Sequence, residues 1–89
     1  MNKPHRNKRL YRRNKAFIQR VKRLARCEEC GYDAHPAALE FHHEESANKT
    51  FSVGSPGTSS IERIKKEIRK CRILCANCHN IEHHESDAP

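Results

Sequence analysis

The sequence predicts a small α+β domain that is stabilised by bound zinc. Two C-x-x-C pairs have the spacing of a four-cysteine zinc site. Residues 37–43 alternate like a strand, and helical periodicity is found at 8–25 and 61–70. A chain of 89 residues has room for one domain and buries a limited apolar core, so a bound metal would supply part of its stability.

The N-terminal part of the chain is predicted to form a basic amphipathic helix. Residues 1–7 are expected to be unstructured, and the helix is expected from about Lys8 to Ala25. Lys and Arg occupy the outer faces, where they would meet solvent or phosphate groups. The apolar stripe, which would pack on the metal-binding module, consists of Leu10, Tyr11, Phe17, Ile18, Val21, Leu24 and Ala25.

Charge is unevenly distributed, which separates a basic arm from a mildly acidic module. Residues 1–26 hold eleven Lys and Arg and no acid, whereas residues 27–89 hold seven Lys and Arg and eleven Asp and Glu. This asymmetry predicts a polyanionic partner, with nucleic acid favoured over a membrane surface and over a solvated or disordered basic segment. The side chains expected to bind nucleic acid are Lys8, Arg9, Arg12, Arg13, Lys15, Arg20, Lys22 and Arg23.

The elements expected after the basic arm are short. A capping-box pattern, Ser59 to Glu62, is predicted to open the second helix. The tail from residue 85 to 89 is expected to be frayed. In chain order the predicted elements are a strand at 37–43, a strand at 49–53, a loop at 54–60, a helix at 61–70, a short strand at 72–74 and a helix at 76–84.

The C-x-x-C pairs predict one tetrahedral, structural Zn²⁺ site. Closing the 44 residues between the pairs, 31 to 74, would strongly restrict the unfolded chain. An alternative ligand set replaces one cysteine with His79, and disulfides or unliganded thiols are the other interpretations. Cys71 is left over and is expected to be a small buried apolar group. The predicted ligands are Cys27, Cys30, Cys75 and Cys78.

The cysteine pattern and the N-terminal composition favour a reducing, cytoplasmic setting. The N-terminus is basic and polar, so no signal peptide is expected, and the longest apolar runs are too short to cross a membrane. In a reducing setting, C-x-x-C pairs bind metal more often than they form disulfides.

Five of the seven histidines fall in two places, at 42–43 and 79–84. His79 and His83 are spaced i, i+4 and would share one helix face, where His42 could add a third metal ligand. His42 and His43 are adjacent on a strand, so their side chains point to opposite sides and take different tasks. One metal ligand and one general base fit this division. The alternatives are surface histidines or a histidine that completes the zinc site.

The motifs "CEEC", "LEFHH" and "ILCANCHNIEH", in this order, resemble the HNH endonuclease family in its four-cysteine zinc subgroup. The resemblance covers residues 27–84. It implies a ββα-metal fold, in which a two-stranded hairpin and a helix surround one divalent ion, here with a basic N-terminal helix and a helix inserted within 54–71. It also implies hydrolysis of phosphodiester bonds, usually in DNA.

The resemblance assigns roles to individual histidines. His43 matches the general base that activates water, and His42 matches the metal ligand that precedes it. His79 matches the ligand on the helix, and His83 matches the second helix histidine found in part of the family. His84 has no match. The ion implied at this catalytic site is Mg²⁺ or another divalent cation.

One position departs from the family pattern. The family's middle asparagine, which orients the base or binds metal, commonly lies shortly before the second C-x-x-C pair. This chain has Lys70 there. Asn48, Asn77 and Asn80 are near enough in sequence to be considered for the role.

The sequence therefore predicts a cytoplasmic, metal-dependent endonuclease or nickase that acts on DNA in a bacterium or a phage-infected host cell. No membrane and no small-molecule cofactor are expected to take part. One ion and one base hydrolyse one strand in each binding event, so double-strand cleavage would need two binding events or a dimer. The sequence is compatible with a monomer and with a dimer. The alternatives are a non-catalytic, zinc-stabilised nucleic-acid-binding module of a larger phage or mobile-element assembly and an RNA-binding or ribosome-associated zinc protein.

Overall fold

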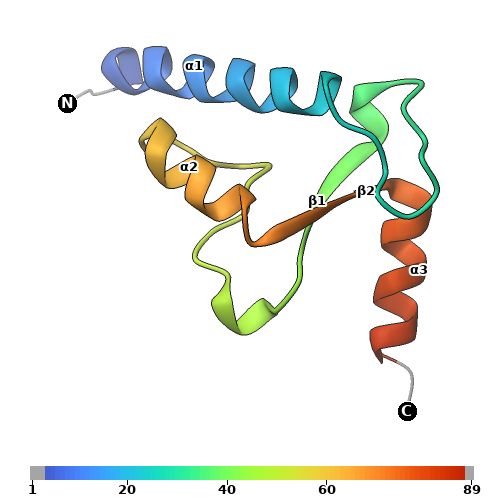
Figure 1. Ribbon diagram of the computed structural model, residues 1–89. Helices are drawn as coiled ribbons and strands as arrows, with labels where there is room; N and C mark the ends of the chain where they lie inside the picture. The colour runs from blue at the N-terminus through green and yellow to red at the C-terminus, as the bar shows by residue number, and fades with distance from the viewer. Residues whose placement is uncertain (1–3, 88–89) are drawn as a thin grey trace.

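The computed structural model describes the backbone of residues 4–87 and the side chains of residues 8–85. Within this range the chain forms a small α+β structure with a two-stranded antiparallel sheet and three α-helices (Figure 1). One-turn 3₁₀ helices precede and follow the first strand. The helices and strands are α1 (Pro4–Arg23), β1 (Leu39–His43), α2 (Ile61–Ile68), β2 (Cys71–Cys75) and α3 (Ala76–Asp87).

The sheet places α2 and α3 on opposite sides of β1 (Figure 1). Strand β1 pairs with β2 so that Leu39 lies opposite Cys75 and His43 opposite Cys71. Because side chains alternate along a strand, Phe41 and His43 share a face, and they contact the core around α2 and Glu67 of α2. Glu40 and His42 face α3, which carries the other histidines of the predicted metal site.

The second predicted strand, at residues 49–53, is not formed. Strand β1 pairs instead with β2, which extends the short strand expected at 72–74. In the 49–53 segment the backbone N–H of Thr50 donates to the carboxylate of Glu67, and Phe51 and Val53 pack into the core. The segment therefore has alternating side chains but uses its backbone to hold an acidic side chain.

Helix α1 differs from the prediction at both ends. It begins at Pro4, so the expectation of an unstructured segment is wrong for residues 4–7, while residues 1–3 lie outside the described range. Proline is tolerated at the first helical position because it has no N–H to lose there. The helix ends at Arg23, and Leu24, assigned to the apolar stripe, is 84% exposed.

Two small cores hold the elements together. The first contains Cys27, Leu39, Leu74 and Cys75, so two of the predicted zinc ligands belong to it. The second joins α1 to α2 and to the segment between β1 and α2 through the buried residues Ile18, Val53 and Ile64. Cys71 is half-buried against this second core, and burial raises the pKa of its thiol to about 11, as suits the predicted apolar role.

A buried asparagine fixes α1 on the rest of the molecule. Asn14 is fully buried, and its side-chain amide donates to the carbonyl oxygens of Gly57 and Ser59 at 3.0 and 2.8 Å. Helix α2 then begins after Ser60, whose hydroxyl accepts from the backbone N–H of Arg63 at 3.2 Å. The helix cap is thus Ser60, one residue later than the first residue of the predicted capping box.

Helix α3 follows β2 without a loop and extends to Asp87, beyond the predicted end at residue 84. Residues 85–87, part of the expected frayed tail, are helical in the structure, and residues 88–89 lie outside the described range. Within residues 4–87, none of the helices combines the length and the apolar character needed to cross a membrane.

Candidate metal centres and active site

The four predicted zinc ligands lie together. The sulfur atoms of Cys27, Cys30, Cys75 and Cys78 all lie within 4.8 Å of one another. The Sγ atoms of Cys30 and Cys75 are 3.8 Å apart. Tetrahedral Zn²⁺ with bonds of about 2.3 Å would separate its sulfur ligands by about 3.8 Å, whereas a disulfide bond is about 2.0 Å long. All five cysteines are free of disulfides, so this cluster is compatible with a bound zinc ion.

Local turns prepare this cluster for a cation. Gly31 follows the first pair with a φ of 82°, which glycine adopts without the penalty of a side chain. The N–H of Cys30 points at the Sγ of Cys27 at 3.5 Å, and the N–H of Cys78 points at the Sγ of Cys75 at 3.4 Å. Burial alone would raise the pKa of Cys27, but backbone N–H groups lower it to about 6, which favours the thiolate that binds metal.

A second cluster consists of three imidazole rings. His42 comes from the face of β1 opposite the core, and His79 and His83 come from successive turns of α3. One ring nitrogen from each lies within 4.8 Å of the others. The ring centroids are 5.1 Å apart for His42 and His79 and 4.7 Å apart for His79 and His83. The structure thus brings together the three histidines predicted to bind a catalytic ion. His84 is exposed and is not one of the three.

Glu40 supports this cluster from behind. Its Oε1 lies 2.5 Å from Nδ1 of His79, which leaves Nε2 of His79 to face the other rings. Histidine ligands commonly donate their second ring N–H to a carboxylate, which fixes the ring and raises its basicity. Glu40 had no predicted role. Glu40 lies two residues before His42 and therefore on the same face of the strand, which is the sequence feature that could have predicted its contact with the cluster.

The donor set of this cluster fits a divalent transition metal. Burial, followed by the neighbouring His79, lowers the pKa of His42, so its imidazole is neutral and has a lone pair to share. Imidazole nitrogens suit Zn²⁺, Ni²⁺ or Co²⁺, whereas Mg²⁺ prefers oxygen ligands and water. Among the divalent ions that the sequence left open, the geometry therefore favours a first-row transition metal over Mg²⁺.

His43 lies on the other side of β1 and is almost fully buried, with 8% of its side chain exposed. Its Nε2 is 2.7 Å from Oε2 of Glu67, a residue of α2. His43 nevertheless reaches the same cleft as the imidazole cluster. The cleft has a volume of about 540 Å³ and lies between the end of β1, the segment after it and α3. Its lining includes His42, His43, His79, His83, Lys49 and Ser52.

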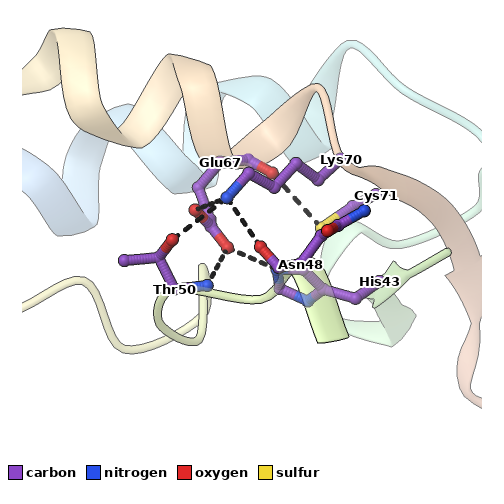
Figure 2. A network of polar contacts seen from close by, with 6 residues as sticks. All are labelled: His43, Asn48, Thr50, Glu67, Lys70 and Cys71. Atoms are coloured by element: carbon purple, nitrogen blue, oxygen red, sulfur yellow. Dashed lines mark hydrogen bonds and ion pairs between the residues drawn. The ribbon is translucent and has the colours of Figure 1, made fainter. Parts of the chain in front are cut away.

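Glu67 is the centre of a polar network that connects α2 to the segment after β1 (Figure 2). The carboxylate accepts from the backbone N–H of Thr50 at 2.8 Å and forms an ion pair with Lys70 at 3.1 Å. Burial alone would raise the pKa of Glu67, but the bonds from Thr50, His43 and Lys70 lower it to about 2. Glu67 is therefore ionised, although only 3% of its side chain is exposed.

Lys70, which stands where the resemblance expects asparagine, also belongs to this network. Its Nζ donates to the carbonyl of Asn48 at 2.7 Å and to the hydroxyl of Thr50 at 3.0 Å. The Asn48 side chain binds Glu45 instead of a histidine. Asn77 and Asn80 are exposed on α3. The position is thus occupied by a cation that holds the segment after β1.

The predicted nucleic-acid-binding residues form a mostly exposed basic surface on α1. Two of the eight contact segments outside α1: Arg13 donates to the carbonyl of Ser59 at 3.1 Å, and Lys22 lies 5.7 Å from the ring centroid of Phe41. The remaining six, which define the α1 basic face, are Lys8, Arg9, Arg12, Lys15, Arg20 and Arg23.

Comparison with protein-family models, with curated proteins and with solved structures gave no match for this chain.

Proposed function

We propose that this protein is a metal-dependent endonuclease or nickase of the HNH type that hydrolyses phosphodiester bonds in DNA. The observation that carries the proposal is the composition of the cleft. A cluster of three imidazoles and a separate buried histidine, His43, open into the same space. A metal-binding group beside a candidate general base is the arrangement that hydrolysis of a phosphodiester needs.

In this proposal His43 takes the proton from the attacking water. One of its ring nitrogens is engaged by Glu67, and the other is available to the cleft. Bound by His42, His79 and His83, a divalent ion would supply Lewis-acid stabilisation of the charge that develops on the phosphoryl and leaving oxygens. Lys49 lines the cleft and would attract the phosphate group.

The α1 basic face would hold the DNA backbone. Contacts from its cations to phosphate groups would position the DNA without reading its base sequence. The four-cysteine cluster contributes indirectly. Zinc bound there would hold the segment between α1 and β1 against β2 and α3.

The alternative function is a non-catalytic zinc module that binds nucleic acid within a larger assembly. It needs only the four-cysteine cluster and the α1 basic face, and the presence of Lys70 in place of the family asparagine favours it. It leaves the grouping of His42, His79 and His83 without a purpose, and it predicts binding without cleavage.

The test compares the wild type with His43→Ala in a supercoiled-plasmid nicking assay and a DNA-binding assay. We expect nicking to fall by about 10²–10⁴-fold, the usual contribution of a general base, while DNA binding is retained. His84→Ala is the matched control, because His84 is exposed on α3 outside the imidazole cluster. Unchanged nicking by His43→Ala would show that His43 is not the base.

A further inference from the structure

We infer that Glu67 is the positioning residue of His43: its carboxylate holds the imidazole with the proton on Nε2 and leaves Nδ1 to accept a proton from water in the cleft. The inference rests on the proposed function and deepens it, because it names the atom that acts as the base and the group that selects this atom.

The geometry requires a proton between the two groups. Nε2 of His43 and Oε2 of Glu67 are 2.7 Å apart, the distance of a charge-assisted hydrogen bond. An ionised carboxylate only accepts hydrogen bonds, so Nε2 must donate. A neutral imidazole that carries its proton on Nε2 has its lone pair on Nδ1. The bond therefore selects one tautomer.

The surroundings of Glu67 keep it in the accepting state. A lone carboxylate at 3% exposure would be costly, but Oε2 also accepts from Thr50 and Oε1 is paired with Lys70. These bonds explain why the pKa of Glu67 lies far below its usual value in spite of burial. The carboxylate is thus held in place from three directions.

The same network places the walls of the cleft. Lys70 binds the carbonyl of Asn48 and the hydroxyl of Thr50, so the segment after β1 is tied to the anchor that holds the histidine (Figure 2). Lys49 and Ser52 of this segment line the cleft. The network of Glu67 and Lys70 therefore holds both His43 and the segment that lines the cleft. In this inference it provides the orienting role that the resemblance assigns to an asparagine.

Proton transfer to His43 accompanies the attack on phosphorus. An O–H bond of water breaks, its proton goes to Nδ1 of His43, and the water oxygen uses the electron pair to bond to phosphorus. The bond from phosphorus to the 3′ oxygen breaks, and that oxygen leaves with the electron pair and takes a proton from solvent. His43 becomes an imidazolium, whose charge the carboxylate of Glu67 stabilises through Nε2–H, as the carboxylate of a catalytic triad does.

The first test is a nicking assay of Glu67→Gln. The glutamine side chain has nearly the same size but is uncharged, so it stabilises the imidazolium form of His43 less than the carboxylate does. We expect the rate at saturating DNA to fall by about 10²-fold or more. The DNA concentration for half-maximal rate and the zinc content should be unchanged, which a general loss of structure would not allow. Glu62→Gln, an exposed position on the same helix, is the matched control.

The second test requires neither activity nor a variant. A long-range ¹H–¹⁵N NMR spectrum distinguishes protonated from unprotonated ring nitrogens, and we expect His43 of the wild type to have protonated Nε2 and unprotonated Nδ1 in its neutral form. The opposite tautomer would overturn the inference. Undiminished nicking by a folded Glu67→Gln would also overturn it if His43→Ala abolishes nicking. If His43→Ala is fully active, the proposed function has failed, and the NMR result alone decides the tautomer.

Discussion

Two adjacent histidines of β1 point to opposite faces of the strand and have different partners. His42 points to α3 and joins the imidazole cluster, while His43 points to α2 and binds Glu67. The alternation of strand side chains is sufficient to predict this division from sequence. It does not predict the partners, because Glu40 and Glu67 meet the histidines through contacts between distant segments.

A residue-scale prediction concerns Glu40. Glu40→Gln should weaken the binding of Zn²⁺ or Co²⁺ to the imidazole cluster by about 10–100-fold, because the carboxylate no longer holds Nδ1 of His79. Calorimetric titration of protein that retains its four-cysteine zinc measures this change. Glu85→Gln, an exposed position on α3, should bind as the wild type does. Equal affinities of the two variants would show that the Glu40 contact has no effect on the metal.

Glu67 had a signal in the sequence that the prediction did not use. Ile64, Glu67 and Ile68 are spaced i, i+3 and i+4, so a glutamate occupies the buried face of the predicted helix. A buried acid needs a partner, and this spacing is a reason to look for one. The identity of that partner could not be predicted, because His43 is 24 residues away in the chain.

At the scale of elements, local periodicity predicted where helices and strands form better than it predicted which strands pair. The helices near 8–25, 61–70 and 76–84 and the strand that ends at the histidine pair are all present. The partner of this strand was predicted at 49–53, but it is Cys71–Cys75. Strand alternation describes one segment at a time, and pairing is decided by tertiary contacts such as the bond from Thr50 to Glu67.

The packing of α1 on the rest of the molecule gives a prediction about stability. Asn14→Ala should lower the free energy of unfolding by about 1–3 kcal/mol, because it leaves the carbonyls of Gly57 and Ser59 without this donor. The shift of the denaturation midpoint measures the loss. Lys15→Ala, next to it on the exposed side, should shift the midpoint little. Similar midpoints for both variants would mean that α1 is not held through Asn14.

The α1 basic face gives a second prediction. The double variant Arg9→Gln and Arg12→Gln should weaken DNA binding and reduce the dependence of affinity on salt, by a slope of about one for each phosphate that is no longer neutralised. Fluorescence anisotropy at several salt concentrations measures both quantities. The control is Lys65→Gln with Lys66→Gln, which removes two exposed charges from α2. If both double variants lose affinity equally, net charge and not the α1 basic face attracts the DNA.

At the scale of the whole molecule, the proposed function gives the two candidate metal centres different roles, one structural and one chemical. Two members of the four-cysteine cluster, Cys27 and Cys75, belong to the first core, and the cluster brings together the segment before β1, β2 and α3. The three histidines of the imidazole cluster line the cleft. The spacing of the cysteines predicted the first centre, and the spacing of histidines predicted the second. The preference for a transition metal at the second cluster follows from its three imidazole donors.

Loss of the first centre should unfold the chain. Cys75→Ser should abolish zinc binding and cooperative unfolding, because the free energy of structural zinc binding, about 10–16 kcal/mol in small zinc domains, exceeds what so small a core supplies. Cys71→Ala should keep its zinc, because Cys71 packs against the second core and is not in the cluster. Zinc analysis with circular dichroism measures both outcomes. A folded, zinc-free Cys75→Ser would contradict the structural role.

The most direct test of metal-dependent cleavage is plasmid nicking by protein that retains its structural zinc but from which mild chelation has removed any ion bound by the imidazole cluster. We predict that such protein binds DNA without cutting it, that added Co²⁺, Ni²⁺ or Zn²⁺ restores nicking, and that none of these ions restores nicking to His79→Ala. Nicking that survives chelation, or that His79→Ala performs as the wild type does, would contradict the account. Binding without nicking under every divalent ion would contradict it as well and would favour the non-catalytic module.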